Sequence, residues 1–282
     1  MSPAAPTFLY GLIGLPVAGN PTQEMMEAAF AAAGVDARYV SLEVRPGHLA
    51  DAVLGLRALG FHGVHVTVPH KVQVLPLLER LTSAAALAGA VNCIKREEDL
   101  LVGDNTDGRG FVDSLRSLRD PAGATVAVLG AGGAARAIVA ELALAGAARI
   151  ILVNRTARRA ADITARIADE TGVECEPAQL TDPWVVPREV EVVVHATTVG
   201  MADPAERIAV DWSQVDGRAI AADVVISPST AFLREAEAHG HRVLDGLGML
   251  VEQAVIGFRW WTGFDPDKAA MRSALERELR LS

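Results

Sequence analysis

Three polar residues of catalytic type, a lysine, an amide and a carboxylate, follow short apolar stretches in the first part of this chain. Lys71 comes after the apolar run 63–68, Asn92 follows later, and Asp107 lies in the glycine-flanked segment 103–108. Oxidation of an alcohol requires a group that accepts the hydroxyl proton, a charge that sets the pKa of that group, and donors that hold the substrate oxygens. The three side chains could together meet these needs, so they form a candidate site for alcohol oxidation.

Asp107 and Lys71 could also have purely structural roles at the starts of helices. An aspartate is a good N-cap, so Asp107 could cap the helix that follows it, alone or alongside a catalytic role. A lysine at a helix start gains nothing from the helix dipole, which favours anions there. The position of Lys71 therefore needs a reason other than helix stability.

A glycine-rich turn follows the apolar run 125–129 and opens an alanine-rich helical stretch. The turn reads Gly130-Ala131-Gly132-Gly133-Ala134-Ala135-Arg136. Glycines at such a strand-to-helix turn allow a sharp bend and close approach of a pyrophosphate, and a small residue at Ala135 lets the helix pack on the strand. The segment predicts a dinucleotide site, and a glycine-rich turn without a ligand is the alternative.

The next apolar run, 149–153, indicates which dinucleotide is bound. It ends at the segment 154–156, where an NAD-binding enzyme places an acidic residue against the ribose hydroxyls. No acid stands here, and Arg155, Arg158 and Arg159 offer guanidinium groups that can bind a 2′-phosphate. We therefore expect NADP, with NAD as the weaker alternative, although Arg158 and Arg159 could also simply cover a solvated helix face.

Alternating short apolar runs and alanine-rich stretches predict an α/β protein with parallel strands. Strands are expected over 7–13, 37–44, 63–68, 125–129, 149–153, 190–195 and 219–225. A helix is expected from Asn20 as N-cap through Ala33, with Pro21 at its first position and Gln23 three residues after the cap. Further helices are expected over 107–118 and from Gly246 to the end, with a break at 263–266.

The turn-rich segment 120–124 separates two parts of the chain. We expect a substrate-binding and catalytic α/β domain over 1–106 with 247–282, and a Rossmann-type NADP-binding domain over 107–246. The C-terminal helices are expected to pack back on the first domain, with a cleft between the two domains.

Composition excludes several classes of partner. The formal net charge of −9 comes without any basic stripe, so nucleic acid is not expected. Cys93 and Cys175 show no CxxC spacing, so neither a metal site nor a disulfide framework is indicated. The apolar opening 7–18 contains glycines and Pro16 and is too short to span a bilayer. We expect a cytoplasmic protein whose partner is a small polar ring substrate; a homodimer is compatible with the sequence, which does not determine the oligomeric state.

Considered together, these segments resemble the shikimate/quinate dehydrogenase family. The family patterns GxNVTxPxK, AVNT and GxNTDG are similar to residues 63–71, 90–93 and 103–108. The patterns GAGGAAR, NRTxxR, NATSxGM and GLGMLVxQ are similar to residues 130–136, 154–159, 195–201 and 246–253. The resemblance runs through nearly the whole chain in the family's order, which makes it far more specific than any single motif.

The resemblance implies an NADP-dependent oxidoreductase that moves a hydride between the nicotinamide and a secondary alcohol on a small polar ring, such as shikimate. Lys71 and Asp107 would be the catalytic pair, and Thr67, Asn92 and Gln253 would bind the substrate. The residues implied to contact the cofactor are Gly130, Ala131, Gly132, Gly133, Ala134, Asn154, Arg155, Thr156, Arg159, Thr197, Val224, Gly246 and Met249.

The chain departs from the family at the substrate carboxylate. Ala18 and Asn20 stand where the pattern GxPxxHSxSPxxHN has two serines, and Ile226 replaces the tyrosine of DxxYxP. Each lost hydrogen bond to the carboxylate removes about 0.5–1.5 kcal/mol or somewhat more. We therefore expect a divergent member that acts on a related polyol or cyclitol, or on a shikimate analogue that is held differently. The alternative is shikimate or quinate, with Thr22 or Gln23 replacing the serines.

Three residues inside the motifs also differ from the family pattern. His65 and His195 replace asparagines, and Cys93 replaces a threonine. His65 could face the substrate or be a satisfied core histidine, and no proton-transfer role is assigned to it. The role of His195 stays open.

Two other functions compete with the dehydrogenase. The chain could be a sensor or regulatory protein that binds NADP without turnover, although the retention of both Lys71 and Asp107 argues against it. A methyltransferase that binds S-adenosylmethionine would explain the glycine-rich turn but not the segment 154–156 or the ordered motifs.

Overall fold

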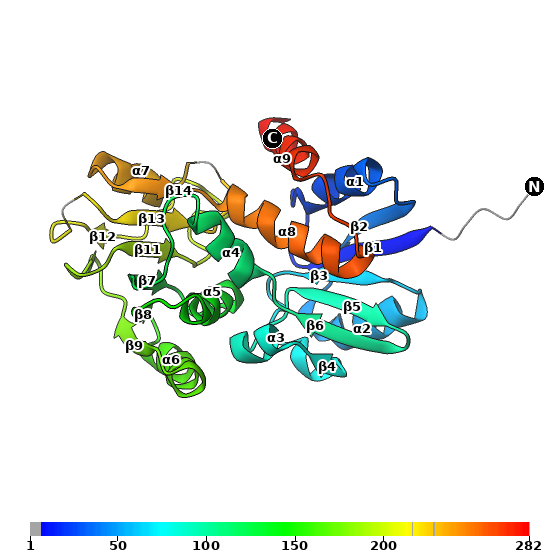
Figure 1. The fold of residues 1–282 in the computed structure, drawn as a ribbon, viewed down its shortest axis with the longest axis horizontal. Coiled ribbons are helices and arrows are strands. Elements are labelled where there is room, and N and C mark those ends of the chain that lie inside the picture. Colours follow the sequence, from blue (N-terminus) through cyan, green and yellow to red (C-terminus); the bar gives the residue numbers. More distant parts are fainter. Residues whose placement is uncertain (1–6, 216, 228, 282) are drawn as a thin grey trace, which may run out of the picture. The chain divides into compact units, whose positions relative to one another are not determined.

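The computed structural model describes residues 7–215, 217–227 and 229–281, and these divide into two compact units. One unit contains the described residues through Thr106 together with those from Gln253 onward, and the other contains Asp107–Glu252. Each unit is built on one six-stranded sheet with helices packed against it (Figure 1). In the described part of the chain, no helix combines the length and the apolar character needed to cross a membrane.

The sheet of the first unit has the strand order β2-β1-β3-β5-β6-β4. Its strands are β1 (Phe8–Gly14), β2 (Ala37–Glu43), β3 (Gly63–Val66), β4 (Arg80–Leu81), β5 (Cys93–Glu97) and β6 (Leu100–Asp104). β1 pairs in parallel with β2 and β3, whereas β5 is antiparallel to both β3 and β6. β5 and β6 thus form an antiparallel hairpin that the sequence did not predict, and β6 also pairs in parallel with β4.

The helices of this unit are α1 (Thr22–Ala32), α2 (Leu49–Ala58), α3 (Ser83–Ala88), α9 (Lys268–Leu281) and the part of α8 (Gly246–Thr262) after Glu252. Trp261 of α8 stacks on Tyr10 with ring centroids 5.1 Å apart, and Phe258 lies 5.2 Å from Phe30 of α1. The C-terminal helices thus pack on the sheet of the first unit, as predicted.

The start of α1 differs from the predicted capping box. Pro21 is the N-cap residue and offers no side-chain cap. Asn20 lies one residue earlier, where its Oδ1 accepts the backbone N–H of Thr22 at 3.0 Å. Gln23 does not turn back to the cap, because its Oε1 accepts the N–H of Ser41 at 3.1 Å.

The sheet of the second unit is entirely parallel, with the order β14-β13-β11-β7-β8-β9. Its strands are β7 (Thr125–Leu129), β8 (Arg149–Asn154), β9 (Glu174–Gln179), β11 (Val192–His195), β13 (Ile220–Asp223) and β14 (Arg242–Leu244). When the six strands are renumbered 1 to 6 in chain order and the sheet is read from β9 to β14, their order is 3-2-1-4-5-6, the order of dinucleotide-binding folds. A separate pair, β10 (Trp184–Val185) and β12 (Val210–Asp211), lies outside this sheet.

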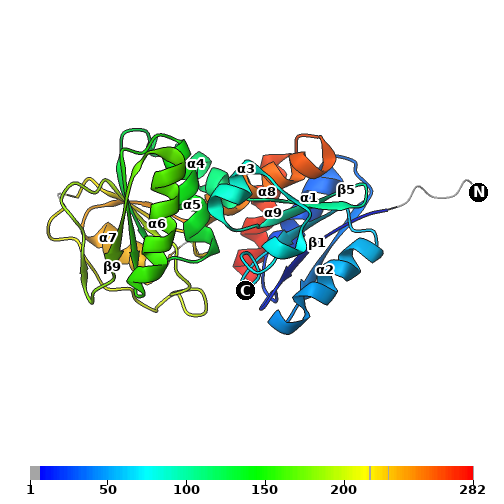
Figure 2. The same cartoon turned by 90° about the horizontal axis from the view of Figure 1, so that it is seen from below.

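Helices cover both faces of the second sheet, with α5 (Gly133–Leu144) and α6 (Ala157–Thr171) on one face and α7 (Ala231–Ala238) on the other (Figure 2). The helix α4 (Asp107–Leu115) packs tightly on α5, because a Cβ added at Gly108 would lie 2.3 Å from the carbonyl oxygen of Ala137. All seven predicted strands are present within a few residues, and the α/β class with a Rossmann-type domain is confirmed.

Candidate active site

A buried group of polar side chains joins three distant segments of the first unit. Asn92 Nδ2 donates to Thr106 Oγ1 at 2.9 Å and to Gln253 Oε1 at 3.2 Å. Asn92 Oδ1 accepts the backbone N–H of Thr106 at 2.7 Å. Thr106 was not among the predicted site residues, although it lies in the segment 103–108 that carried the prediction. The structure thus brings Asn92 and Gln253 together and adds a hydroxyl between them.

Backbone hydrogen bonds place Lys71 and Thr67 beside this group. The carbonyl of Lys71 accepts the N–H of Val91 at 2.7 Å, directly before Asn92 in the chain. The N–H of Val66, directly before Thr67, donates to the carbonyl of Asn92 at 2.7 Å, and the N–H of Thr67 donates to the carbonyl of Ile13 at 2.9 Å. Thr67 therefore lies at the ends of the parallel strands β1 and β3, where ligand sites commonly form, and Lys71 lies beside the segment that carries Asn92.

Asp107 is the first residue of α4 and follows Thr106 directly. It is buried at the start of this helix. Its position in the chain ties it to the Asn92 group through the hydrogen bonds of Thr106.

The segment that departs from the family pattern offers no hydroxyl pair. Ala18 is exposed, and the side-chain oxygen of Asn20 is occupied by a backbone N–H. Thr22 is 3% exposed, and the oxygen of Gln23 is bound to the N–H of Ser41. The remaining departure, Ile226, is partly buried; Pro228 of the same motif lies outside the described residues.

His65 is buried in the sheet of the first unit. Its Nδ1 lies 2.7 Å from the hydroxyl of Tyr39, and its ring centroid lies 4.5 Å from that of Trp261. Burial, and then the nearby charge of Lys71, lower the pKa of His65 to about 3. The imidazole is therefore neutral near pH 7, which agrees with giving it no proton-transfer role.

The glycine-rich turn of the second unit has the space and the donors that a pyrophosphate needs. Gly130 has φ +116°, and a Cβ there would lie 2.6 Å from the carbonyl oxygen of Ala196. Gly132 is the N-cap of α5 and supplies no side-chain cap, and a Cβ added to it would meet no protein atom within 4 Å. The first N–H groups of α5 are thus open to an anion, and the residues 130–134 fit the phosphates of a dinucleotide.

Arginines gather beyond the end of β8. Arg155, Arg158 and Arg159 are exposed around the start of α6, whose N-cap Thr156 makes no side-chain cap. Burial lowers the pKa of the Arg136 guanidinium on α5, and the positive charges of Arg166 and Arg159 lower it further, against an opposing effect of Asp162. These charges suit a 2′-phosphate. Arg136 was missing from the predicted site, although it closes the glycine-rich segment.

Asn154 and Thr156 shape the backbone at the same place. Asn154 Nδ2 donates to the carbonyl of Thr156 at 3.0 Å, and the N–H of Arg159 donates to that carbonyl at 3.0 Å. The carbonyl of Arg155 accepts from Gln179 Nε2 at 2.6 Å. The predicted NRTxxR residues therefore form one hydrogen-bonded turn between β8 and α6.

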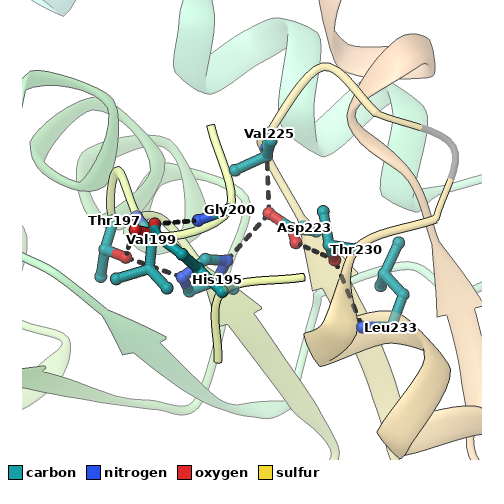
Figure 3. Close-up of polar contacts among 9 residues, drawn as sticks. His195, Thr197, Val199, Gly200, Asp223, Val225, Thr230 and Leu233 are labelled. Atoms are coloured by element: carbon teal, nitrogen blue, oxygen red, sulfur yellow. Dashed lines mark hydrogen bonds and ion pairs between the residues drawn. The ribbon is translucent and has the colours of Figure 1, made fainter. Parts of the chain in front are cut away.

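A second buried network lies at the ends of β11 and β13 (Figure 3). His195 and Asp223 are register partners, and His195 Nδ1 lies 3.0 Å from Asp223 Oδ1. His195 Nε2 lies 2.7 Å from Thr197 Oγ1. His195, to which the sequence assigned no role, is 1% exposed and joins the loops that follow the two strands.

The other predicted cofactor residues lie on the same side of the second unit. The N–H of Val224 donates to the carbonyl of His195 at 3.1 Å. A Cβ on Gly246 would lie 2.4 Å from the carbonyl oxygen of Val225, so the start of α8 packs against this loop. Met249 follows within the first turn of α8.

Comparisons with known proteins identify the family. The chain matches the shikimate dehydrogenase substrate-binding domain over residues 12–94, the shikimate/quinate 5-dehydrogenase domain over 114–202, and the shikimate 5′-dehydrogenase C-terminal domain over 246–276. It is 42% identical to the shikimate dehydrogenase (NADP⁺) of Geobacter metallireducens over 94% of this chain and 95% of that protein.

Solved structures of similar proteins indicate the same family. The ligand-free 5-ketofructose reductase of Gluconobacter sp. strain CHM43 is 44% identical, covers 96% of this chain and 99% of its own, and superposes with a TM-score of 0.89. The shikimate 5-dehydrogenase of Thermus thermophilus in complex with NADP(H) and shikimate is 33% identical, covers 96% of this chain and 100% of its own, and has a TM-score of 0.84. The chain therefore belongs to the shikimate dehydrogenase family of NADP-dependent oxidoreductases that act on a CH–OH group.

Proposed function

We propose that this chain interconverts a small, neutral, cyclic polyol and its ketone with NADP, and that it prefers such substrates to shikimate. The observation that carries the proposal is a contrast within the first unit. The Asn92–Thr106–Gln253 group and Lys71 are retained, whereas Ala18, Asn20 and Ile226 offer no hydroxyl for a substrate carboxylate.

The resemblance to the 5-ketofructose reductase supports the same substrate class. That protein is named for a neutral keto sugar and is 44% identical to this chain over nearly the full length of both. A neutral polyhydroxylated ring needs several hydrogen-bonding partners but no carboxylate clamp. The amides and hydroxyls of Thr67, Asn92 and Gln253 suit that need.

In the proposed reaction the cofactor transfers the hydride, and residues of the chain transfer the proton and hold the substrate. When bound, NADP supplies or accepts the hydride. Lys71 takes up the hydroxyl proton during oxidation and returns it to the carbonyl oxygen during reduction, and Asp107 stabilises the charged lysine and hydrogen-bonds the substrate. Thr67, Asn92 and Gln253 hold the remaining hydroxyls and thereby orient the reacting carbon.

The adenosine and nicotinamide parts of NADP are assigned to different residues of the second unit. Gly130, Ala131, Gly132, Gly133 and Ala134 receive the pyrophosphate. The adenosine side is taken by the turn Asn154, Arg155, Thr156 and Arg159, and the nicotinamide side by Thr197, Val224, Gly246 and Met249.

Shikimate or quinate is the second candidate, because the relative from Geobacter metallireducens, which is 42% identical to this chain, is named shikimate dehydrogenase (NADP⁺). A binding protein without turnover is less well supported, since the relatives reported above are named as enzymes.

Initial rates separate these candidates. NADPH oxidation is followed with 5-ketofructose and keto-cyclitols, and NADP⁺ reduction with shikimate, quinate and the matching polyols. We expect the highest kcat/KM for a neutral substrate, and Lys71→Ala should lower kcat about 10²-fold or more while NADPH still binds. Lys95→Ala, a lysine of the same unit that lies over Trp260, is the matched control and should keep the wild-type rate.

Each alternative has its own result in this assay. A higher kcat/KM for shikimate or quinate would overturn the neutral-substrate proposal while leaving the family reaction in place. NADPH binding without turnover of any compound in the panel would favour the sensor.

We also propose that the chain works in the cytoplasm. Both cysteines, Cys93 and Cys175, are free thiols, as is usual in a reducing compartment. Fractionation of cells that express the tagged chain tests this.

A further inference from the structure

A hydrogen bond to Asp223 holds the His195 imidazole in place (Figure 3). Asp223 Oδ1 accepts the N–H of Val225 at 2.9 Å, and Oδ2 accepts the hydroxyl of Thr230 at 2.6 Å. His195 Nδ1 lies 3.0 Å from Oδ1. Asp223 accepts from Val225 and Thr230, and a carboxylate oxygen in this setting also accepts from the ring, so the Nδ1 proton points at Oδ1.

The other ring nitrogen fixes the side chain of Thr197. The Thr197 hydroxyl is hydrogen-bonded to His195 Nε2 at 2.7 Å and accepts the N–H of Val199 at 3.1 Å. With its hydroxyl held on both sides, Thr197 turns its methyl group toward the glycine-rich turn. A Cβ placed on Gly130 would lie 3.2 Å from Thr197 Cγ2. The imidazole thus sets one wall of the space beside the first glycine.

This space lies where the strand order of the second sheet reverses. β7 is the neighbour of both β8 and β11, and dinucleotides bind in the crevice at such a switch point. The arginines beyond β8 mark the side of the adenosine phosphate, so the nicotinamide half falls on the side of β11 and β13. His195 stands at the end of β11, and its partner Asp223 stands at the end of β13.

The bridge continues to the helix that carries Met249. The N–H of Val225 is bound to Asp223, and its carbonyl oxygen would lie 2.4 Å from a Cβ at Gly246, the first residue of α8. One buried imidazole therefore connects the loops that follow β11 and β13 and, through the second loop, the start of α8.

We propose that His195 is a positioning residue for the nicotinamide half of NADP, acting through the hydroxyl of Thr197. The inference rests on the proposed binding of NADP at this edge of the sheet. The family pattern has asparagine at this position, whose amide is smaller than the imidazole that links Asp223 and Thr197 here.

The test uses the full-length protein with His195→Asn, Thr197→Val and the double variant. NADPH and 2′,5′-ADP are titrated separately, because 2′,5′-ADP contains the adenosine and 2′-phosphate but no nicotinamide. We expect His195→Asn to weaken NADPH binding about fivefold, the effect of one lost neutral hydrogen bond, and to leave the affinity for 2′,5′-ADP within about twofold. Because His195 acts through Thr197, the double variant should lose no more than the larger single effect.

His239→Asn is the matched control, since His239 is exposed on the same unit and its Nδ1 is bonded to the carbonyl of Glu235 in its own helix. It should leave both affinities unchanged. Equal losses of affinity for NADPH and 2′,5′-ADP would show a general structural defect and overturn the proposal. Unchanged NADPH affinity in His195→Asn would also overturn it. So would a double variant in which the two single effects multiply.

Two further outcomes keep the two proposals separate. If His195→Asn fails to fold, Thr197→Val decides, because valine keeps the shape of threonine and removes only the hydroxyl; an unchanged NADPH affinity then overturns the proposal. If the wild type binds NADPH but reduces no ketone, the proposed function fails, whereas the ratio of the two affinities still decides the role of His195.

Discussion

The side-chain amide of Asn92 donates to Gln253, 161 residues later in the chain, with 3.2 Å between Nδ2 and Oε1. Thr106 completes the group, since its hydroxyl lies 2.9 Å from the same nitrogen and its backbone N–H is bound to Asn92 Oδ1 at 2.7 Å. A helix near the C-terminus and two loops of the first unit therefore share one buried set of hydrogen bonds. The proposed substrate contacts are held in place before any ligand arrives.

Asn92→Ala should destabilise the protein as well as weaken substrate binding. The substitution leaves the buried N–H of Thr106 without its acceptor, which costs about 1–3 kcal/mol. Urea unfolding measures the loss, and a higher KM for the substrate should accompany it. Gln73→Ala, an exposed amide of the same unit, is the control and should change stability by no more than about 0.5 kcal/mol. An unchanged unfolding midpoint in Asn92→Ala would contradict the structural role.

Alanine substitutions at two glycines of the same turn should affect different properties, cofactor binding for one and thermal stability for the other. Gly132→Ala should keep the thermal midpoint, because its Cβ would meet no protein atom within 4 Å, but should weaken NADPH binding by filling the space meant for the pyrophosphate. Gly130→Ala should lower the midpoint, since φ is +116° and the Cβ would lie 2.6 Å from the carbonyl oxygen of Ala196. Thermal unfolding and NADPH titration of both variants check this. Full NADPH affinity in Gly132→Ala would argue against a pyrophosphate at this turn.

Arg136 and Arg159 should set the preference for NADP. Removing either guanidinium with alanine should raise the KM for NADPH about tenfold to a hundredfold, because hydrogen bonds to a charged phosphate contribute about 1.5–3 kcal/mol. The KM for NADH should change little, since NADH has no 2′-phosphate. Steady-state kinetics with both cofactors give the ratio, and Arg116→Ala serves as the control, since Arg116 lies just after α4 and pairs with Asp113. Equal effects on NADPH and NADH would place the 2′-phosphate elsewhere.

His65 should make the protein less stable in acid. Its pKa is about 3 in the folded state, against an ordinary value of 6.5, because burial and the charge of Lys71 disfavour the protonated ring. Between these two values the unfolded chain binds a proton that the folded chain does not. The contribution is therefore fully present above pH 6.5 and is lost as the pH falls toward 3, at up to about 1.4 kcal/mol per pH unit.

The variant His65→Asn isolates this effect. His62 and His241 also have lowered pKa values, mainly through burial, and they contribute to the acid sensitivity of both proteins. The difference in slope between wild type and variant over about pH 4 to 6.5 is therefore the quantity to measure by urea unfolding. Parallel slopes would mean that His65 is already protonated in the folded state or is accessible to water.

Local sequence patterns were sufficient for the elements that one run of residues defines. The strand β7, the glycine-rich turn after it and the helix α5 follow from an apolar run, from glycines where φ is positive or space is needed, and from alanines that pack. The hairpin β5–β6 escaped prediction, because its central residues are charged and its strands are held by pairing rather than by an alternating pattern.

The tertiary structure alone decided which polar side chains meet. The sequence singled out Asn92 and Gln253 from a resemblance, but only the fold joins them through Thr106. It likewise makes His195 and Asp223 neighbours, because strand register across a parallel sheet determines which side chains lie side by side. Periodicity reports contacts within a strand or a helical turn, whereas hydrogen bonds between distant segments depend on how strands and helices pack.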